Sequence, residues 1–96
     1  MKRLNNLATA AISALDMKRK GFDVKGIIVT EDSYHQYKEK NPAFNGEIGI
    51  RDTLGRESFY VLPLSKEQAE RIEITLRDDI VAYSHWTLEE WKKLLE

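Results

Sequence analysis

The chain has 96 residues, enough for one hydrophobic core but not for two. Fifteen basic and sixteen acidic side chains leave a formal net charge of -1, so no overall field attracts nucleic acid or an anionic membrane. The absence of cysteine excludes disulfides, thiolate nucleophiles and sulfur-ligated metals, and it fits a reducing compartment. We therefore expect one cytoplasmic domain over residues 1–96.

The N-terminal segment imitates a secretory signal, because two basic residues precede an apolar run at residues 7–15. Polar Thr9 and Ser13 dilute this run, and the charged residues 16–20 stand where a small-residue cleavage site would be needed. The run is also much shorter than the roughly 20 apolar residues that span a bilayer. A secreted or membrane-anchored protein is therefore not expected.

Residues 3–20 predict an amphipathic helix that ends at Gly21, with Phe22 folding back as in a Schellman motif. Its apolar residues recur at spacings of three and four: Leu4, Leu7, Ala8, Ala11, Ile12 and Leu15. Three basic residues, 18–20, occupy the last turn, where cations complement the helix dipole. Binding of phosphate is the alternative role of these side chains.

Residues 24–30 predict a strand whose apolar residues occupy both faces, so both faces should be covered. A short polar helix follows at residues 31–40 and ends at Asn41, because the residue before a proline leaves the helical region. Its cap is Ser33 in a capping box, or alternatively Thr30 or Asp32. The strand, helix and returning strand favour a right-handed crossover.

Residues 46–64 predict a β-hairpin around a type I turn at residues 52–55. We prefer a three-residue loop, which pairs Arg51 with Glu57, because a four-residue loop would set Arg51 opposite Arg56. The preferred register gives the hairpin one apolar face and one mixed face. The apolar face carries Ile48, Ile50, Tyr60 and Leu62, and the mixed face carries Phe59 and Val61 beside Gly49, Glu47, Arg51 and Glu57.

The C-terminal third begins with a capping box at Ser65, after which residues 71–84 allow two interpretations. A helix is favoured, because one stripe at the helical period contains Ala69, Ile72, Leu76, Ile80 and Tyr83. Alternation around a turn at residues 78–79 would instead give a second hairpin. A second capping box at Thr87 opens a last helix over residues 88–95, with Trp86 packing on Trp91 as a hydrophobic staple.

These elements predict an α+β fold with a small, mainly antiparallel three-stranded sheet. The expected order is first hairpin strand, second hairpin strand and then the strand at residues 24–30, because residues 58–62 form the most apolar strand. The N-terminal helix and the long C-terminal helix should cover one face. The helix at residues 31–40 should lie at an edge or on the second face.

The residues that carry chemistry in enzymes form no recognisable pattern here. His35 and His85 lie about fifty positions apart, and a zinc site would need carboxylates from several elements as further ligands. No serine stands in a nucleophile elbow, the glycines lack a phosphate-cradling spacing, and adjacent acid pairs diverge on a helix. We therefore expect neither an enzyme nor a bound cofactor or metal.

Small domains without a catalytic pattern usually act by binding, so the first hypothesis is a protein-interaction module. It would regulate or inhibit a larger protein, or act as a homodimeric adaptor. Its surface would be the mixed sheet face or the aromatic ends of the molecule, because tyrosine and tryptophan are frequent at interfaces. The candidate residues are Tyr34, Tyr37, Arg51, Glu57, Phe59, Val61, Trp86 and Trp91.

Two further hypotheses remain open. A nucleic-acid-binding surface would combine cations with stacking rings, and its candidates are Lys18, Arg19, Lys20 and Lys25 with Tyr34 and Tyr37. Its binding would fall steeply with ionic strength. A small enzyme or ligand-binding domain would instead need a pocket between sheet and helix that holds His35 or His85.

Overall fold

The computed structural model describes residues 7–73 and 82–96. The elements in these ranges alternate between helix and strand except at the hairpin, which confirms the predicted α+β class. In chain order they are α1 (Leu7–Arg19), β1 (Gly26–Thr30), α2 (Glu31–Lys40), β2 (Glu47–Asp52), β3 (Gly55–Leu64), α3 (Lys66–Arg71), β4 (Ala82–Ser84) and α4 (Leu88–Leu95).

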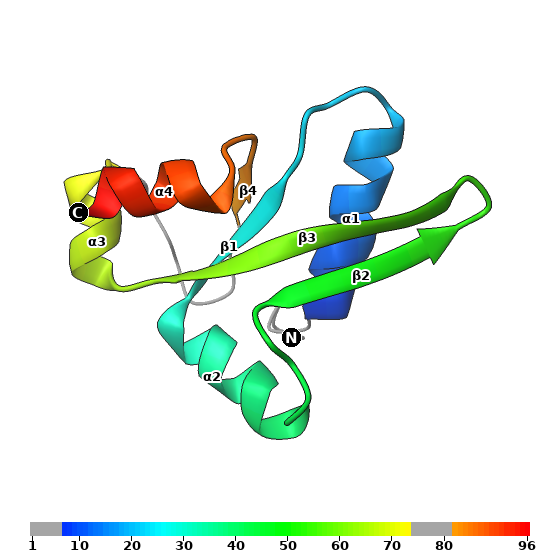
Figure 1. Cartoon of the computed structure of the whole chain (residues 1–96). Helices are drawn as coiled ribbons and strands as arrows, with labels where there is room; N and C mark the ends of the chain where they lie inside the picture. Colours follow the sequence, from blue (N-terminus) through cyan, green and yellow to red (C-terminus); the bar gives the residue numbers. More distant parts are fainter. Residues whose placement is uncertain (1–6, 74–81) are drawn as a thin grey trace, which may run out of the picture.

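The described strands form one mixed sheet in the order β2-β3-β1-β4 (Figure 1). The antiparallel hairpin β2–β3 lies beside β1, which runs parallel to β3, and β4 pairs antiparallel with β1. The predicted order of the hairpin and the first strand is confirmed, and β4 adds a fourth strand. Helix α2 leads the chain from β1 into β2, which runs antiparallel to β1, and the hairpin then reverses the direction again, so β3 runs parallel to β1. A connection of this length is needed because parallel neighbours cannot be joined by a tight turn.

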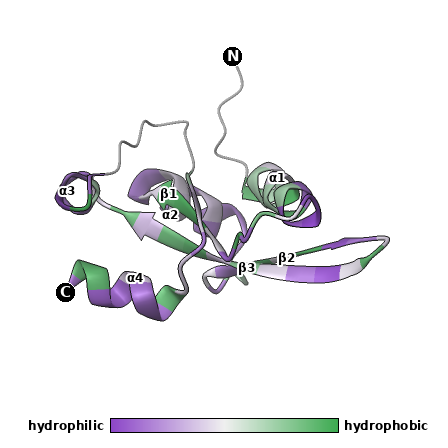
Figure 2. Cartoon of the chain, turned by 90° about the horizontal axis from the view of Figure 1, so that it is seen from above, coloured by the Kyte–Doolittle hydropathy of each residue, from purple (hydrophilic) through white to green (hydrophobic). Residues whose placement is uncertain are grey.

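The sheet is covered on both faces by different helices. Figure 2 shows α1 and α4 on opposite sides of it. One core cluster, beneath α1 and α2, contains Leu7, Ala10, Ala11, Ala14, Leu15, Val24, Ile27, Val29, Phe44, Phe59 and Val61. The other, beneath α3 and α4, contains Ile28, Leu64, Ala69 and Trp91.

The predicted placement of the N-terminal and C-terminal helices on one face is therefore wrong. Central strand β1 decides this arrangement, because it directs Ile27 and Val29 to the first cluster and Ile28 to the second. A strand that is apolar on both faces needs cover on both. The helices are consequently divided between the two sides.

Helix α1 ends in the predicted Schellman motif. Gly21 has a φ of 103°, its N–H donates to the carbonyl of Lys18 at 3.0 Å, and the N–H of Phe22 donates to the carbonyl of Met17 at 3.1 Å. The buried stripe differs in detail from the predicted one. It runs through Ala10 and Ala14, whereas Ile12 is 59% exposed and Leu4 lies outside the described residues.

The other local predictions of helix ends are confirmed. Helix α2 has the predicted bounds. Of its three candidate caps the structure has Thr30, whose hydroxyl accepts from the N–H of Ser33, and not the capping box at Ser33. Both capping boxes, at Ser65 and Thr87, have their two reciprocal hydrogen bonds. Each of these signals depends on neighbouring residues only, which is why the sequence alone was sufficient to find them.

The predicted hairpin register is wrong by one residue. The structure pairs Ile48 with Phe59, Ile50 with Glu57 and Arg51 with Arg56. A one-residue shift moves a strand's side chains to the other face. Here it turns Ile48 and Ile50 toward the cluster beneath α1, so burial of two isoleucines outweighs the unfavourable pairing of two arginines.

The predicted long C-terminal helix is also wrong. Helix α3 ends at Arg71, Glu73 has a φ of 59° in the left-handed region, and Tyr83 lies in β4. Pairing with β1 decides this, because Gly26, Ile27 and Ile28 take partners from residues 82–84. The proposed helical stripe through Leu76 and Ile80, and the alternative turn at residues 78–79, lie outside the described residues.

None of the helices in residues 7–73 and 82–96 has both the length and the apolar content of a membrane span. The longest described helix, α1, has 13 residues. A membrane-spanning helix needs roughly 20.

Candidate interaction surface

An ion-pair cluster joins the end of α1 to the tip of the hairpin. Arg19 holds Asp52 through two hydrogen bonds of 2.9 Å, Nε to Oδ2 and Nη2 to Oδ1, and its Nη1 lies 3.2 Å from Glu57. Lys18 Nζ lies 3.0 Å from Glu57. Hydrogen bonds from Arg19 lower the pKa of Asp52, and hydrogen bonds from Lys18 lower that of Glu57. The cluster thus fixes the hairpin against α1.

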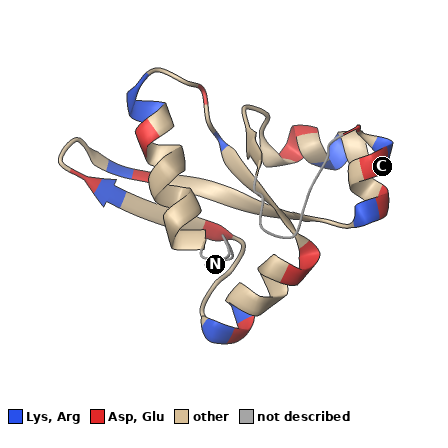
Figure 3. Cartoon of the chain, turned by 180° about the vertical axis from the view of Figure 1, so that it is seen from behind, with Lys and Arg blue, Asp and Glu red and all other residues tan. Residues whose placement is uncertain are grey.

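The cations proposed for nucleic-acid binding each have a carboxylate partner within the chain. Figure 3 shows basic and acidic residues side by side at the end of α1 and along the hairpin. The pairs are Lys18 with Glu57, Arg19 with Asp52, Lys20 with Asp16 and Lys25 with Asp23. Figure 1 places α2, with its two tyrosines, at the opposite end of β1 from Lys25. The structure therefore does not bring these cations and rings together.

Tyr34 and Tyr37 on α2 are half-buried against the segment that enters β2. Both rings meet Phe44 edge to face, at centroid distances of 5.4 and 5.0 Å. Phe44 itself is buried in the cluster beneath α1 and α2. The two tyrosines therefore anchor α2 to the core, and only part of each ring faces solvent.

The aromatic C-terminal end is mostly part of the core. Trp91 is 2% exposed and its indole N–H donates to Ser84 Oγ, while Trp86 is 36% exposed and packs on Trp91 at 5.1 Å between ring centroids. The Tyr60 hydroxyl contacts both Ser84 Oγ and the carbonyl of Trp86, and burial raises the pKa of Tyr60. Of the two tryptophans, only Trp86 offers a surface to a partner.

The residues predicted to form a mixed, exposed sheet face do not form one surface in the structure. Phe59 is 0% and Val61 4% exposed, because both lie in the cluster beneath α1. Glu57 is engaged by α1, whereas Arg51 lies on the opposite face. The error follows from the hairpin register, which set these residues together.

The correct register assembles a different surface, which we call the open face. Here α4 lies over β1 and the end of β3 but leaves β2 and the hairpin tip free, and Figure 2 shows the hairpin extending away from α4. Arg51 and Arg56 lie opposite each other, and no ion pair involves either of them within the described residues. The open face consists of Glu47, Gly49, Arg51, Arg56 and Ser58, all exposed.

The open face borders a free strand edge. The N–H of Val61 donates to the carbonyl of Gly46 at 2.8 Å, which fixes the alternation of hydrogen bonds along the hairpin. By that alternation Glu47, Gly49 and Arg51 direct their N–H and C=O groups away from β3. Since β2 is the end strand of the sheet, these groups have no strand partner within the described residues. The predicted strand order already placed this strand at the sheet edge, whereas the residues that point outward follow from the observed register.

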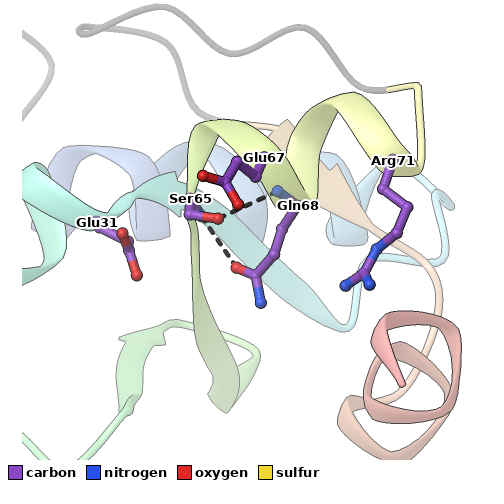
Figure 4. A pocket seen from close by; sticks show the side chains of 5 residues that line it. All are labelled: Glu31, Ser65, Glu67, Gln68 and Arg71. Atoms are coloured by element: carbon purple, nitrogen blue, oxygen red, sulfur yellow. Dashed lines mark hydrogen bonds between the residues drawn. The ribbon is translucent and has the colours of Figure 1, made fainter.

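A shallow depression of about 410 Å³ lies between the start of α2 and α3 (Figure 4). It is lined by Glu31, Ser65, Glu67, Gln68 and Arg71. Ser65 and Gln68 already form the capping box of α3, and Arg71 donates to the carbonyl of Leu95 at 2.8 Å. Three of the five lining side chains therefore serve the fold.

Neither histidine takes part in a metal site that the described residues could form. His35 is exposed on α2, and His85 is exposed after β4 with its ring 5.4 Å from that of Trp86. No group of three or more histidine, aspartate or glutamate side chains in residues 7–73 and 82–96 could hold a metal ion.

The free edge of β2 and the open face beside it are consequently the candidate functional site. Within residues 7–73 and 82–96 they offer backbone groups without a strand partner and two arginines without an ion pair. Comparisons of this chain with protein-family models, with curated proteins and with solved structures find no match.

Proposed function

We propose that this protein is a non-enzymatic interaction module that binds protein by adding a strand to the edge of β2. The observation that carries the proposal is the row of outward backbone groups at Glu47, Gly49 and Arg51, which lacks a strand partner in the described residues. Main-chain hydrogen bonds to such an edge supply affinity, and side chains on alternate positions supply specificity. If the partner needs the segment that pairs with β2 for its own activity, binding would regulate or inhibit that partner.

The composition of β2 supports this function. Folded proteins protect long edge strands with charged side chains, with proline, with bulges, with inward-pointing charges or with a covering segment. The exposed charges of β2, Glu47 and Arg51, have opposite signs, so they can pair with charges of an added strand as well as repel them. Strand β2 has six residues, contains no proline, pairs with β3 without a bulge, and carries glycine at its third position. An edge of this kind, which no strand covers among residues 7–73 and 82–96, is expected to be retained because it is used.

The decisive variants are at Gly49, whose N–H points outward. Gly49→Pro removes that donor, and the ladder to β3 loses nothing because residue 49 is not in a hydrogen-bonded pair. Gly49→Ala is the matched control, since it keeps the N–H. Its Cβ would meet the guanidinium of Arg56 at 2.6 Å, and this end of an exposed, flexible side chain can move away.

The test is a pull-down from a lysate of the source cells with tagged wild type, Gly49→Ala and Gly49→Pro, each with and without nuclease. A protein captured in stoichiometric amount by wild type and Gly49→Ala, and lost with Gly49→Pro, supports strand addition. Capture that Gly49→Pro leaves intact contradicts it. Capture that nuclease abolishes would favour the nucleic-acid hypothesis instead, and salt dependence would then confirm that binding depends on phosphate contacts.

A further inference from the structure

We infer that the strand added to β2 is β2 of a second copy of this chain, running antiparallel with Gly49 on the two-fold axis. This inference rests on the proposed function and specifies its partner. Closed two-fold pairing through one self-complementary patch is the commonest form of protein assembly. The result would be one continuous sheet through both copies.

The open face is self-complementary in this arrangement. Outward-pointing residues of antiparallel neighbours face each other directly, so Gly49 meets Gly49 of the second copy. Glu47 then lies opposite the second copy's Arg51, and the symmetry repeats this pair on the other side of the axis. All these side chains project to the same face, since residues two apart on a strand share a face. Two ion pairs therefore flank a pair of glycines.

The opposite face of the same strand is complementary as well. Ile48 lies opposite the second copy's Ile50, again twice by symmetry. Both isoleucines are half-buried at the margin of the cluster beneath α1, so pairing would extend that cluster across the interface. β-branched residues in direct cross-strand pairs stabilise sheets. In this single register, opposite charges pair on one face of the sheet and isoleucines pack against each other on the other face.

The arginines of the open face give an independent reason for this partner. Arg51 lies directly opposite Arg56 in its own hairpin, an unfavourable like-charge pair that has no counter-charge among the described residues. Glu47 of a second copy supplies the missing carboxylate beside Arg51. Shifting the register by two residues would instead set Gly49 opposite Glu47 or Arg51 and remove both ion pairs.

The test measures self-association of the purified chain by sedimentation equilibrium, up to millimolar concentration because a single strand pair is a small interface. Glu47→Arg and Arg51→Glu each place like charges opposite one another at both ion-pair positions. Each variant alone should dimerise about tenfold more weakly than wild type, or worse. An equal mixture of the two variants restores opposite charges at both positions, so it should form heterodimers with affinity near that of wild type.

The control is Lys92→Glu, which changes the net charge as Arg51→Glu does but lies exposed on α4, away from β2. It should leave self-association unchanged. Melting temperatures of all variants establish that the monomers remain folded, as expected for exposed positions. Equal weakening by Lys92→Glu, or a mixture no tighter than its separate components, would overturn the inference.

A wild type that stays monomeric at every concentration would also overturn self-pairing. Figure 1 shows α1 crossing behind β2. Pairing with a second copy must therefore accommodate two α1 helices on the same side of the sheet, whereas pairing with a single peptide strand needs room for only one. A monomer that still captures a partner sensitive to Gly49→Pro would leave the proposed function standing and reject only this inference. A monomer without such capture would reject both.

Discussion

Substitution of Gly26 by alanine should destabilise the fold far more than the small change in volume suggests. Gly26 is buried in β1 and lies beside Tyr60 of β3 in the parallel register. A Cβ at position 26 would overlap the Tyr60 ring, with three ring carbons no further than 2.6 Å away. The ring cannot simply swing aside, because its hydroxyl is hydrogen bonded to Ser84 and to the carbonyl of Trp86.

The expected magnitude combines overpacking with a lost hydrogen bond. Overpacking of a buried site costs about 1–3 kcal/mol and a broken hydrogen bond about 1 kcal/mol, giving about 2–4 kcal/mol for Gly26→Ala. For a domain of this size each kcal/mol lowers the melting temperature by about 4–8 °C, so a drop of roughly 8–32 °C is expected. Urea unfolding followed by circular dichroism measures the free energy directly.

Two comparisons distinguish overlap with the Tyr60 ring from a general cost of replacing glycine in a strand. Gly49→Ala is the same substitution in β2, another strand of the same sheet, where the contact is a flexible arginine, and it should change the free energy of unfolding little. In the Tyr60→Ala background, Gly26→Ala should cost much less than in wild type, because the ring is gone. A loss below about 0.5 kcal/mol for Gly26→Ala in wild type would refute the reasoning, because substitutions at exposed positions cost no more than that.

Two further predictions concern the polar contacts of the fold. Ser84→Ala leaves the buried indole N–H of Trp91 without its acceptor, so urea unfolding should show a loss of about 1–3 kcal/mol. Because the pKa values of Asp52 and Glu57 are lowered by folding, their contribution is present above their ordinary pKa values and is lost as pH falls below about 4. Arg19→Gln should flatten this acid dependence, measured as melting temperature against pH.

Each of these predictions has a result that would contradict it. Ser58→Ala removes an exposed hydroxyl of the open face and serves as the control for Ser84→Ala. Equal effects of the two would show that the Ser84 contact is unimportant. For the acid dependence, parallel curves for wild type and Arg19→Gln would show that Arg19 does not set the titration of Asp52.

The existence of the hairpin could be predicted from the sequence, but its register could not. Its existence and approximate bounds follow from the turn residues and the flanking apolar runs. Its register follows from α1, which is more than thirty residues away in sequence and which holds Asp52 through Arg19 while burying Ile48 and Ile50. The predicted strand order already placed β2 at the edge of the sheet, but which of its residues turn their backbone groups outward depends on the register and could not be found from the sequence.

The local elements were determined by the sequence itself. The Schellman end at Gly21, the bounds of α2 and the capping boxes at Ser65 and Thr87 all depend on side chains within a few residues of the backbone groups they satisfy. Tertiary structure alone decided the division of the helices between two faces, the end of α3 and the pairing of β4 with β1. These features depend on which distant apolar surfaces meet, and residue spacing along the chain does not encode that choice.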